Sequence, residues 1–256
     1  MTSVGFEYTN KSDETPFETF LRYTDEKQKS AAKLAAVLQQ RLHAGSRILD
    51  IGTGNGEYLQ LALSQVNDLD DVKLTLVEPS ADLSGSLAER FANYSVEIVH
   101  SNLEDFSSQE KFGVVLMSHL FYHVPRKLWA DQLAKALSFL AENGVLVIVL
   151  REKDDAYDFK MAFKPLLFTD SFKALTIDDV IDVLPEKQIL KATRQSAASE
   201  LHFPIDNLYD TVAIIEFYLN KQWEEIPVAI QQSALDFVKQ RDNTFQQMDG
   251  IAIVEP

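Results

Sequence analysis

The 256-residue sequence contains no cysteine, which excludes disulfide bonds, thiolate zinc sites and a cysteine nucleophile. It has no apolar run approaching the ~20 residues of a membrane span, and residues 1–10 lack the basic and apolar pattern of a secretory signal. We therefore expect a cytoplasmic protein without a membrane segment.

Basic residues are also scarce. Lys and Arg number 24 against 39 Asp and Glu, giving a formal net charge of −15. Such a surface repels phosphate backbones and anionic lipid, so nucleic-acid and membrane partners are disfavoured. We expect a small-molecule substrate and a monomer or simple homodimer.

Short apolar segments alternate with helical ones between residues 45 and 150. We expect strands at 47–51, 73–77, 96–99, 114–117 and 145–150, and helices at 57–66, 80–92 and 126–141. This alternation predicts an α/β fold of the Rossmann-like kind, with a mostly parallel sheet covered by helices on both faces. The first strand is expected at the topological switch point, where ligands bind.

The residues before 45 and after 150 are expected to add further helices and strands to this core. Helices are expected to start at Thr15-Pro16 and Thr24-Asp25, the second ending at Gly45. After residue 150 we expect helices at 176–184, 205–219 and 227–239 and strands at 188–193 and 251–254. The whole chain 1–256 is expected to be one domain, in three parts: 15–44 as a helical substrate or lid segment, 45–150 as the cofactor-binding core, and 151–256 as a substrate-side elaboration with the final strands.

Gly52, Gly54 and Gly56 form a turn between a strand ending in Asp50 and a helix. Glycine permits positive φ and close approach of a ligand. A dinucleotide site requires Gly-x-Gly-x-x-Gly, but here the third glycine comes one residue early and Glu57 would face the pyrophosphate. S-adenosyl-L-methionine has no phosphate, and its cationic sulfonium and amino groups suit Asp50. The spacing therefore favours S-adenosylmethionine as cofactor.

Three further segments are expected at the same crevice because they follow strands of the same sheet. Glu78 ends the second strand, 78 − 56 = 22 residues after the last glycine, where an acid hydrogen-bonds ribose hydroxyls. A dinucleotide enzyme would share that acid. Asn102 and the N–H of Leu103 are expected at the adenine ring, and Ser118-His119 at the sulfonium end.

These features resemble the class I S-adenosylmethionine-dependent methyltransferases, over about residues 45–150 and the final strand. The resemblance implies a seven-stranded sheet whose last strand is antiparallel. Within that class the chain is similar to histamine N-methyltransferase and its bacterial relatives. That similarity rests on the segments 20–28, 77–81, 119–124, 175–179 and 251–255.

The resemblance implies roles for individual residues. Glu26 falls on the family's substrate-binding glutamate, Glu78 on its ribose-binding acid, and Gly52 and Ser118 on cofactor contacts, with Pro79 beside Glu78 in the ribose-binding stretch. His119 stands where the family has a glutamine that contacts the imidazole. Gln247 stands near an asparagine that contacts substrate, so two of three polar substrate contacts differ and the acceptor stays open.

The residues themselves agree with a substrate site. Glu26 is expected in the first turn of a helix, although the helix dipole alone would favour a carboxylate there. Tyr23, Tyr122, Phe17, Phe20 and Phe121 would supply aromatic walls for a small cation or a heteroaromatic ring.

We therefore expect methyl transfer to a nitrogen of a small amine or imidazole compound, with Glu26, His119 and Tyr122 orienting the acceptor, helped by Tyr23 and Gln247, and with no metal. The alternatives are methylation of an oxygen or carboxyl acceptor, a methyltransferase-like protein that binds without turnover, and a nucleotide-cofactor oxidoreductase.

Overall fold

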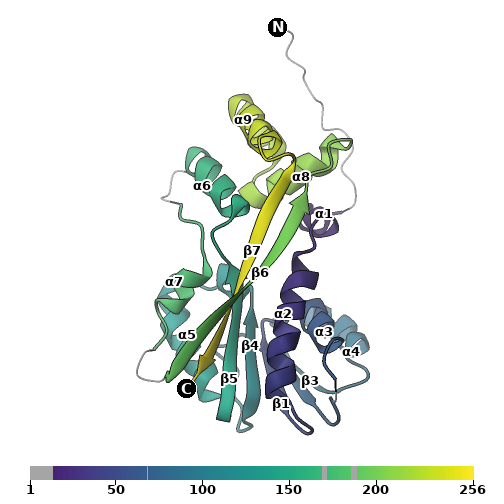
Figure 1. Ribbon diagram of the computed structural model, residues 1–256, viewed down its shortest axis with the longest axis vertical. Coiled ribbons are helices and arrows are strands. Elements are labelled where there is room, and N and C mark those ends of the chain that lie inside the picture. Colours follow the sequence, from purple (N-terminus) through teal and green to yellow (C-terminus); the bar gives the residue numbers. More distant parts are fainter. Residues whose placement is uncertain (1–13, 68, 169–171, 186–188) are drawn as a thin grey trace. The chain divides into compact units, whose positions relative to one another are not determined.

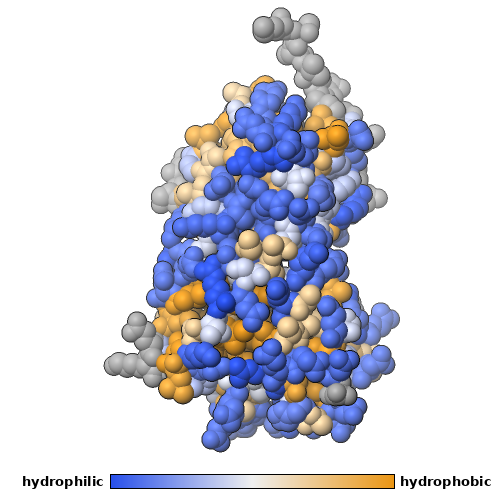
Figure 2. Space-filling model, viewed as in Figure 1, coloured by the Kyte–Doolittle hydropathy of each residue, from blue (hydrophilic) through white to orange (hydrophobic). Residues whose placement is uncertain are grey.

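The computed structural model describes residues 14–67, 69–168, 172–185 and 189–256 (Figure 1). The first residue of the strand expected at 188–193 lies outside these ranges. Figure 2 shows that hydrophilic residues dominate the visible face, in keeping with the abundance of charged side chains. Within the described ranges, no helix combines the length and apolar character needed to cross a membrane.

The described chain folds into two compact units. Unit 1 contains the described residues up to Asp25, together with Lys153–Ala174 and Ser199–Gln247. Unit 2 contains Glu26–Glu152, Leu175–Ala198 and Met248–Pro256. The expectation of one domain over 1–256 stays a prediction, because two compact units can belong to one domain.

The elements follow one another in an alternating order. The strands are β1 Arg47–Ile51, β2 Lys73–Val77, β3 Ser95–Val99, β4 Phe112–Ser118, β5 Leu140–Arg151, β6 Lys191–His202 and β7 Thr244–Glu255. The α-helices are α1 Pro16–Tyr23, α2 Glu26–Arg41, α3 Glu57–Leu63, α4 Ser84–Arg90, α5 Trp129–Ser138, α6 Asp155–Leu167, α7 Ile177–Ile181, α8 Leu208–Leu219 and α9 Val228–Lys239. Short 3-10 helices are η1 Ala81–Leu83, η2 Leu120–Tyr122, η3 Arg126–Leu128 and η5 Trp223–Glu225.

The strands form a seven-stranded sheet in the order β3-β2-β1-β4-β5-β7-β6. Strands β1 to β5 pair in parallel, and β7 runs antiparallel to β5. The N–H of Leu190 donates to Glu255 and that of Phe203 to Asn243, so β6 is also antiparallel to β7. The predicted Rossmann-like sheet with an antiparallel last strand is confirmed, and β1 lies at the point where the strand order reverses.

Helices cover both faces of the sheet in unit 2. Alternate residues of the central strands point to opposite faces. Leu49 and Val115 share a buried core with α5 and α7, whereas Ile48 and Val114 share another with α2, α3 and α4. Figure 1 shows these two sets of helices on opposite sides of the strands.

Unit 1 has a core of its own. Helices α1, α6, α8 and α9 contribute side chains to a cluster around Phe159, Tyr218 and Phe245, three fully buried aromatic residues. Helix α1 begins at the expected residue, with a capping box in which Thr15 and Glu18 bond reciprocally. The C-terminal part of β6 and the N-terminal part of β7 belong to this unit.

The strands β1 and β2 have the expected bounds, but several other elements differ from the prediction. Helix α2 ends at Arg41, before Gly45, and α5 ends at Ser138 because β5 already begins at Leu140. Strands β6 and β7 extend far beyond 188–193 and 251–254, because the long antiparallel pair satisfies backbone groups in polar sequence. Helix α6 was not expected, and Pro165 within it interrupts the helical pattern.

Candidate cofactor and substrate site

The turn Gly52–Gly56 joins β1 to α3, and its three glycines have φ of +72°, +58° and +75°. A Cβ atom at Gly52 would lie 2.7 Å from Leu120 Cδ1, and one at Gly56 would lie 2.6 Å from the ring of Phe91. A Cβ at Gly54 would have no heavy atom within 4 Å. Gly52 and Gly56 are therefore required by packing, whereas Gly54 lies beside open space that a ligand can approach.

Glu78 follows β2 directly and is 8% exposed. Its Oε2 accepts the N–H of Gly54 at 2.9 Å, and its Oε1 accepts the N–H of Ser80 at 3.0 Å. Each oxygen keeps a second lone pair, so the carboxylate is fixed in place and can still accept two hydroxyl groups. This arrangement suits a ribose and brings Glu78 together with the glycine turn.

Asp50 lies within β1, one residue before its end, and is 4% exposed. Burial raises the pKa of its carboxyl to about 7, with the Glu78 carboxylate adding to this rise and a hydrogen bond to Thr53 opposing it. A nearby cation would bring this pKa down by favouring the ionised form. Asp50 is thus suited to a cationic ligand.

Glu57 is the first residue of α3 and forms an ion pair with Lys27. The hydrogen bond from Lys27 lowers the pKa of Glu57, so its carboxylate is ionised at neutral pH. A dinucleotide would have to place its pyrophosphate against this negative charge. The structure therefore favours a cofactor without phosphate, as the glycine spacing does.

The loops after β3 and β4 lie at the same carboxyl edge of the parallel sheet. Asn102 is exposed and its carbonyl accepts the N–H groups of Asp105 and Phe106, while the Leu103 side chain is buried. Within the described ranges no hydrogen-bond partner is recorded for the Leu103 N–H. Pro79 is exposed after Glu78, and Ser118 is half-buried at the end of β4.

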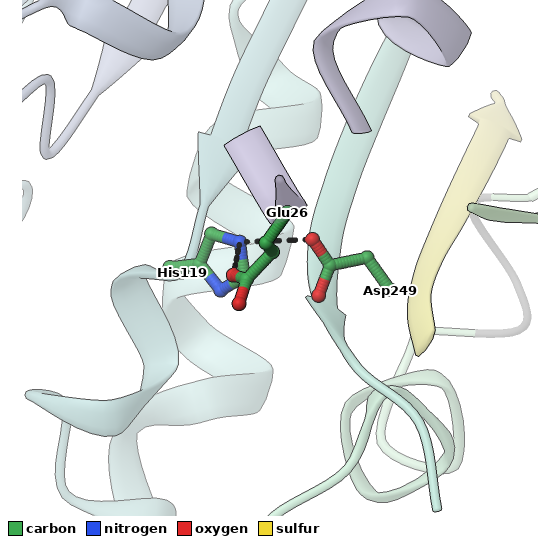
Figure 3. Close-up of side chains that lie close together, drawn as sticks. All are labelled: Glu26, His119 and Asp249. Carbon is green, nitrogen blue, oxygen red and sulfur yellow. Dashed lines mark ion pairs between the residues drawn. The ribbon is translucent and has the colours of Figure 1, made fainter. Parts of the chain in front are cut away.

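Three side chains of unit 2 lie close together (Figure 3). Glu26 is the first residue of α2, His119 follows β4 directly, and Asp249 lies in β7. The Nε2 atom of His119 lies 3.4 Å from Asp249 Oδ2 and 3.7 Å from Glu26 Oε1. Asp249 is 1% exposed, and its carboxylate accepts no hydrogen bond of standard geometry from the described residues. His119 is the main group that stabilises this buried negative charge.

Arg151, the last residue of β5, completes this cluster. Its guanidinium donates to Glu26 Oε2, and its exposure is 7%. It lies opposite Asp249 in the β5–β7 pair. The two buried carboxylates thus face one guanidinium and one imidazole, and the group is electrically neutral when His119 is protonated.

His119 and Asp249 shift each other's protonation. Burial by itself would lower the pKa of His119, but the carboxylates of Asp249 and Glu26 outweigh it and raise that pKa above its usual value of 6.5. Burial would raise the pKa of Asp249, but His119 and Arg151 keep it below its usual range. His119 is held in the left-handed region, with φ of 51°, and its backbone N–H donates to Val149 at 2.8 Å.

Two tyrosines border the imidazole of His119. Tyr122 lies nearly parallel to it, with ring centroids 6.1 Å apart, and is 42% exposed. Tyr58 meets it edge-on at 6.4 Å, and its hydroxyl is hydrogen-bonded with Ser30. Tyr122 therefore lies beside His119, whereas Phe121 is a core residue of unit 2.

The spacing of Glu26, His119 and Asp249 would also admit a metal ion, since one donor atom from each lies within 4.8 Å of the others. A metal would need the Nε2 lone pair of His119, which faces two carboxylates that favour a proton there. Arg151 and that proton already neutralise both carboxylates. We therefore assign none of these residues as a metal ligand.

Tyr23 and Gln247 belong to unit 1. The hydroxyl of Tyr23 donates to Asp210 at 2.6 Å, and this hydrogen bond is the main cause of its raised pKa. Gln247 is 1% exposed, donates to the Tyr218 hydroxyl and accepts from Thr24. Their contact with a substrate stays a prediction.

The other aromatic residues expected near substrate also lie in unit 1. Phe20 is buried in its core, whereas Phe17 is 47% exposed beside an open cavity of about 570 Å³. Asp210, Phe217 and Glu225 are among the residues that line this cavity. Phe17 itself lines this cavity, whereas none of the predicted cofactor contacts does.

Sequence reasoning missed Arg151 and Asp249. Arg151 directly follows six apolar residues at the end of an expected strand. A charged residue at that end of a parallel strand lies at the ligand-binding edge of the sheet, and this position could have identified it. Asp249 was hidden because the final strand was expected to start only at residue 251.

Comparison with known proteins agrees with this geometry. Residues 22–191, more than half of the chain, match the family model described as a methyltransferase domain. No curated protein matches the sequence.

Solved structures share the fold. N-methyltransferase NodS from Bradyrhizobium japonicum, in complex with S-adenosyl-L-homocysteine, has a TM-score of 0.54 and 15% identity, covering 95% of this chain and 90% of that one. The cyclopropane synthase MmaA2 from Mycobacterium tuberculosis has a TM-score of 0.55 and 16% identity, covering 88% and 83%.

The chain therefore belongs to the methyltransferase domain family. It is an S-adenosylmethionine-dependent methyltransferase with the Rossmann-like class I fold.

Proposed function

We propose that this methyltransferase acts on a nitrogen of a small amine or imidazole compound. The observation that supports this choice is the pair of buried carboxylates, Glu26 and Asp249, that lie near Nε2 of His119. With His119 neutral, these two acids and Arg151 have a net charge of −1, which favours a cationic acceptor and disfavours a carboxylate. The likeness of the Glu26 segment to histamine N-methyltransferases supports the same acceptor class.

The proposed cofactor contacts follow from the carboxyl edge of the sheet. Glu78 accepts the ribose hydroxyls, Asn102 and the Leu103 N–H meet the adenine, and Pro79 lies beside the ribose. Gly52, Gly54 and Gly56 shape the turn, with Gly54 leaving room for the ligand. Asp50 and Ser118 face the methionine end.

S-adenosylmethionine supplies a methyl group on a cationic sulfur, ready for direct displacement by a lone pair. The protein must therefore position the acceptor nitrogen, keep it unprotonated and exclude water. Glu26, held by Arg151, and the stacked rings of His119 and Tyr122 orient the acceptor in this proposal. Tyr23 and Gln247 are proposed as further substrate contacts.

A panel of acceptors tests the proposal. Release of S-adenosylhomocysteine would be measured with primary amines, imidazoles, carboxylic acids and alcohols at pH 7 to 9. Amines or imidazoles should be methylated, and Glu26→Gln should reduce their kcat/KM by about tenfold or more, the effect of losing one charged contact. Glu97→Gln, an exposed acid on β3, is the matched control.

Two results would contradict this acceptor class. Turnover of carboxylic acids or alcohols alone would show methyl transfer to oxygen. Binding of S-adenosylmethionine with no acceptor turned over would favour a binding protein of the same fold.

A further inference from the structure

We infer that Asp249 is a positioning residue that keeps a proton on Nε2 of His119, so that Nδ1 is the atom that takes a proton from the acceptor nitrogen. This inference rests on the proposed function, because it concerns the same acceptor. It assigns a role to a residue that sequence reasoning did not single out, and it selects one of the two imidazole nitrogens.

The geometry distinguishes the two nitrogens. Nε2 lies 3.4 Å from Oδ2 of Asp249 and 3.7 Å from Oε1 of Glu26. An ionised carboxylate oxygen can only accept a hydrogen bond. No hydrogen bond is recorded between Nδ1 and any described residue, and the His119 side chain is 30% exposed. In neutral imidazole one nitrogen bears the proton and the other the lone pair. The carboxylates therefore favour the Nε2–H tautomer and leave the Nδ1 lone pair available.

Asp249 is better placed than Glu26 for this role. Its carboxylate is almost fully buried and accepts no hydrogen bond of standard geometry from the described residues, so an N–H at Nε2 adds a donor beside a buried charge that Arg151 also offsets. Glu26 is the more distant of the two and already accepts a hydrogen bond from Arg151 through Oε2. Glu26 is therefore left to orient the acceptor, and Asp249 fixes the imidazole.

The surroundings of His119 are consistent with a base. Its ring meets Tyr122 from η2 and Tyr58 from α3, Glu26 projects from α2, and Arg151 and Asp249 project from β5 and β7. The carboxylates raise the pKa of His119, and Arg151 opposes them. A general base works best when its pKa lies near the working pH, because much of it is then unprotonated and it still binds a proton strongly enough to remove one from the acceptor.

In the proposed proton transfer, an N–H bond of the protonated acceptor breaks, an Nδ1–H bond forms, and His119 becomes an imidazolium cation paired with Asp249. The electron pair left on the acceptor nitrogen forms the new bond to the methyl carbon. The bond between that carbon and the sulfur of S-adenosylmethionine breaks, and its electrons stay on sulfur.

Nitrogen NMR of the imidazoles tests the tautomer without any substrate. The chain has five histidines, and His119→Gln identifies the signal of His119 while His43→Gln, an exposed histidine, serves as the control. In the wild-type protein, neutral His119 should carry its proton on Nε2. In Asp249→Asn, the pKa of His119 should be lower, and its neutral form should populate both tautomers. A wild-type His119 protonated at Nδ1 would overturn the inference, even if Asp249→Asn fails to fold.

The pH profile of kcat/KM tests the proton transfer with a turned-over amine. His119→Gln should reduce kcat about 10²-fold, the usual contribution of a general base. Asp249→Asn should reduce kcat about tenfold or more and shift the acidic limb to lower pH, because the carboxylate that raises the His119 pKa is gone. An acidic limb unmoved by Asp249→Asn would contradict the inference. The expected tautomer with no amine turned over would support the placement of the proton and overturn the proposed acceptor.

Discussion

Arg151 and Asp249 occupy opposite positions in the antiparallel pair formed by β5 and β7. This register brings a guanidinium from the end of a parallel strand beside a carboxylate from the last strand of the sheet. Both side chains are buried, and both face the cluster that contains Glu26 and His119. The charge balance of the site therefore depends on strand pairing.

Replacing Arg151 with methionine should destabilise the folded protein by about 3–5 kcal/mol at pH 7, because it leaves Glu26 and Asp249 as buried charges with one fewer partner. Urea unfolding monitored by circular dichroism measures this change. Arg47→Met is the control: its ion pair with Glu110 is exposed and is worth about 0–1 kcal/mol.

The effect of Arg151→Met should also depend on pH. The lowered pKa of Asp249 contributes stability above its unfolded value, and this stability is lost as the pH falls through the folded pKa. Arg151 supports that lowering, so the difference in unfolding free energy between wild type and variant should shrink as the pH falls below 4. A difference that stays constant from pH 7 to well below pH 4 would show that lost packing, and not charge, explains the change.

Replacing Gly54 with alanine should weaken binding of S-adenosylhomocysteine by tenfold or more, because the new methyl group would project into the space left for the ligand. Gly45→Ala is a matched control, with a φ of +78° and equally open surroundings at the other end of β1. Both variants bear a similar backbone cost of about 1–2 kcal/mol. Equal affinities for the two variants in isothermal titration would contradict a ligand at Gly54.

Glu78→Gln should weaken cofactor affinity by about 10- to 100-fold, since hydrogen bonds to a charged group contribute about 1.5–3 kcal/mol. Isothermal titration with S-adenosylhomocysteine measures this change. Adenosine should show a similar loss because it shares the ribose, whereas methionine should be unaffected. A loss for methionine alone would place Glu78 at the other end of the ligand.

Asp50 should release a proton when the cofactor binds. Its pKa of about 7 means that part of the population is protonated near neutral pH, and a cationic sulfonium would favour ionisation. Titration in buffers of different ionisation enthalpy should show more proton release with S-adenosylmethionine than with S-adenosylhomocysteine, whose sulfur is neutral. Asp50→Asn should remove the difference, and a difference that persists would assign the proton to another group.

The same pKa has a consequence for stability. Because the folded value lies above the unfolded one, the folded chain binds more protons between pH 4 and pH 7, and the stability due to Asp50 is lost as the pH rises through this window. Asp50→Asn should flatten this part of the stability profile. Chemical unfolding at several pH values measures it.

The core of the fold was predictable because its signals are local. The strands β1 and β2 are apolar runs bounded by glycine and polar residues, and Glu78 follows from its distance to the glycine turn. The strands β6 and β7 were underestimated because their polar halves are strands only through pairing with distant segments. Asp249 and Arg151 were missed for the same reason, since no local pattern reveals the register that joins them.

The separation between these two residues also bears on how the sheet is assembled. Asp249 lies 249 − 151 = 98 residues after Arg151, so closing β7 onto β5 requires a contact of long sequence separation. Contacts of this kind form slowly because a large loop must be closed first. During synthesis, the glycine turn and Glu78 emerge early and can assemble with β1, β2 and β4. The cluster around His119 becomes complete only when the last strand arrives, so competence to bind the cofactor should precede competence to hold the acceptor.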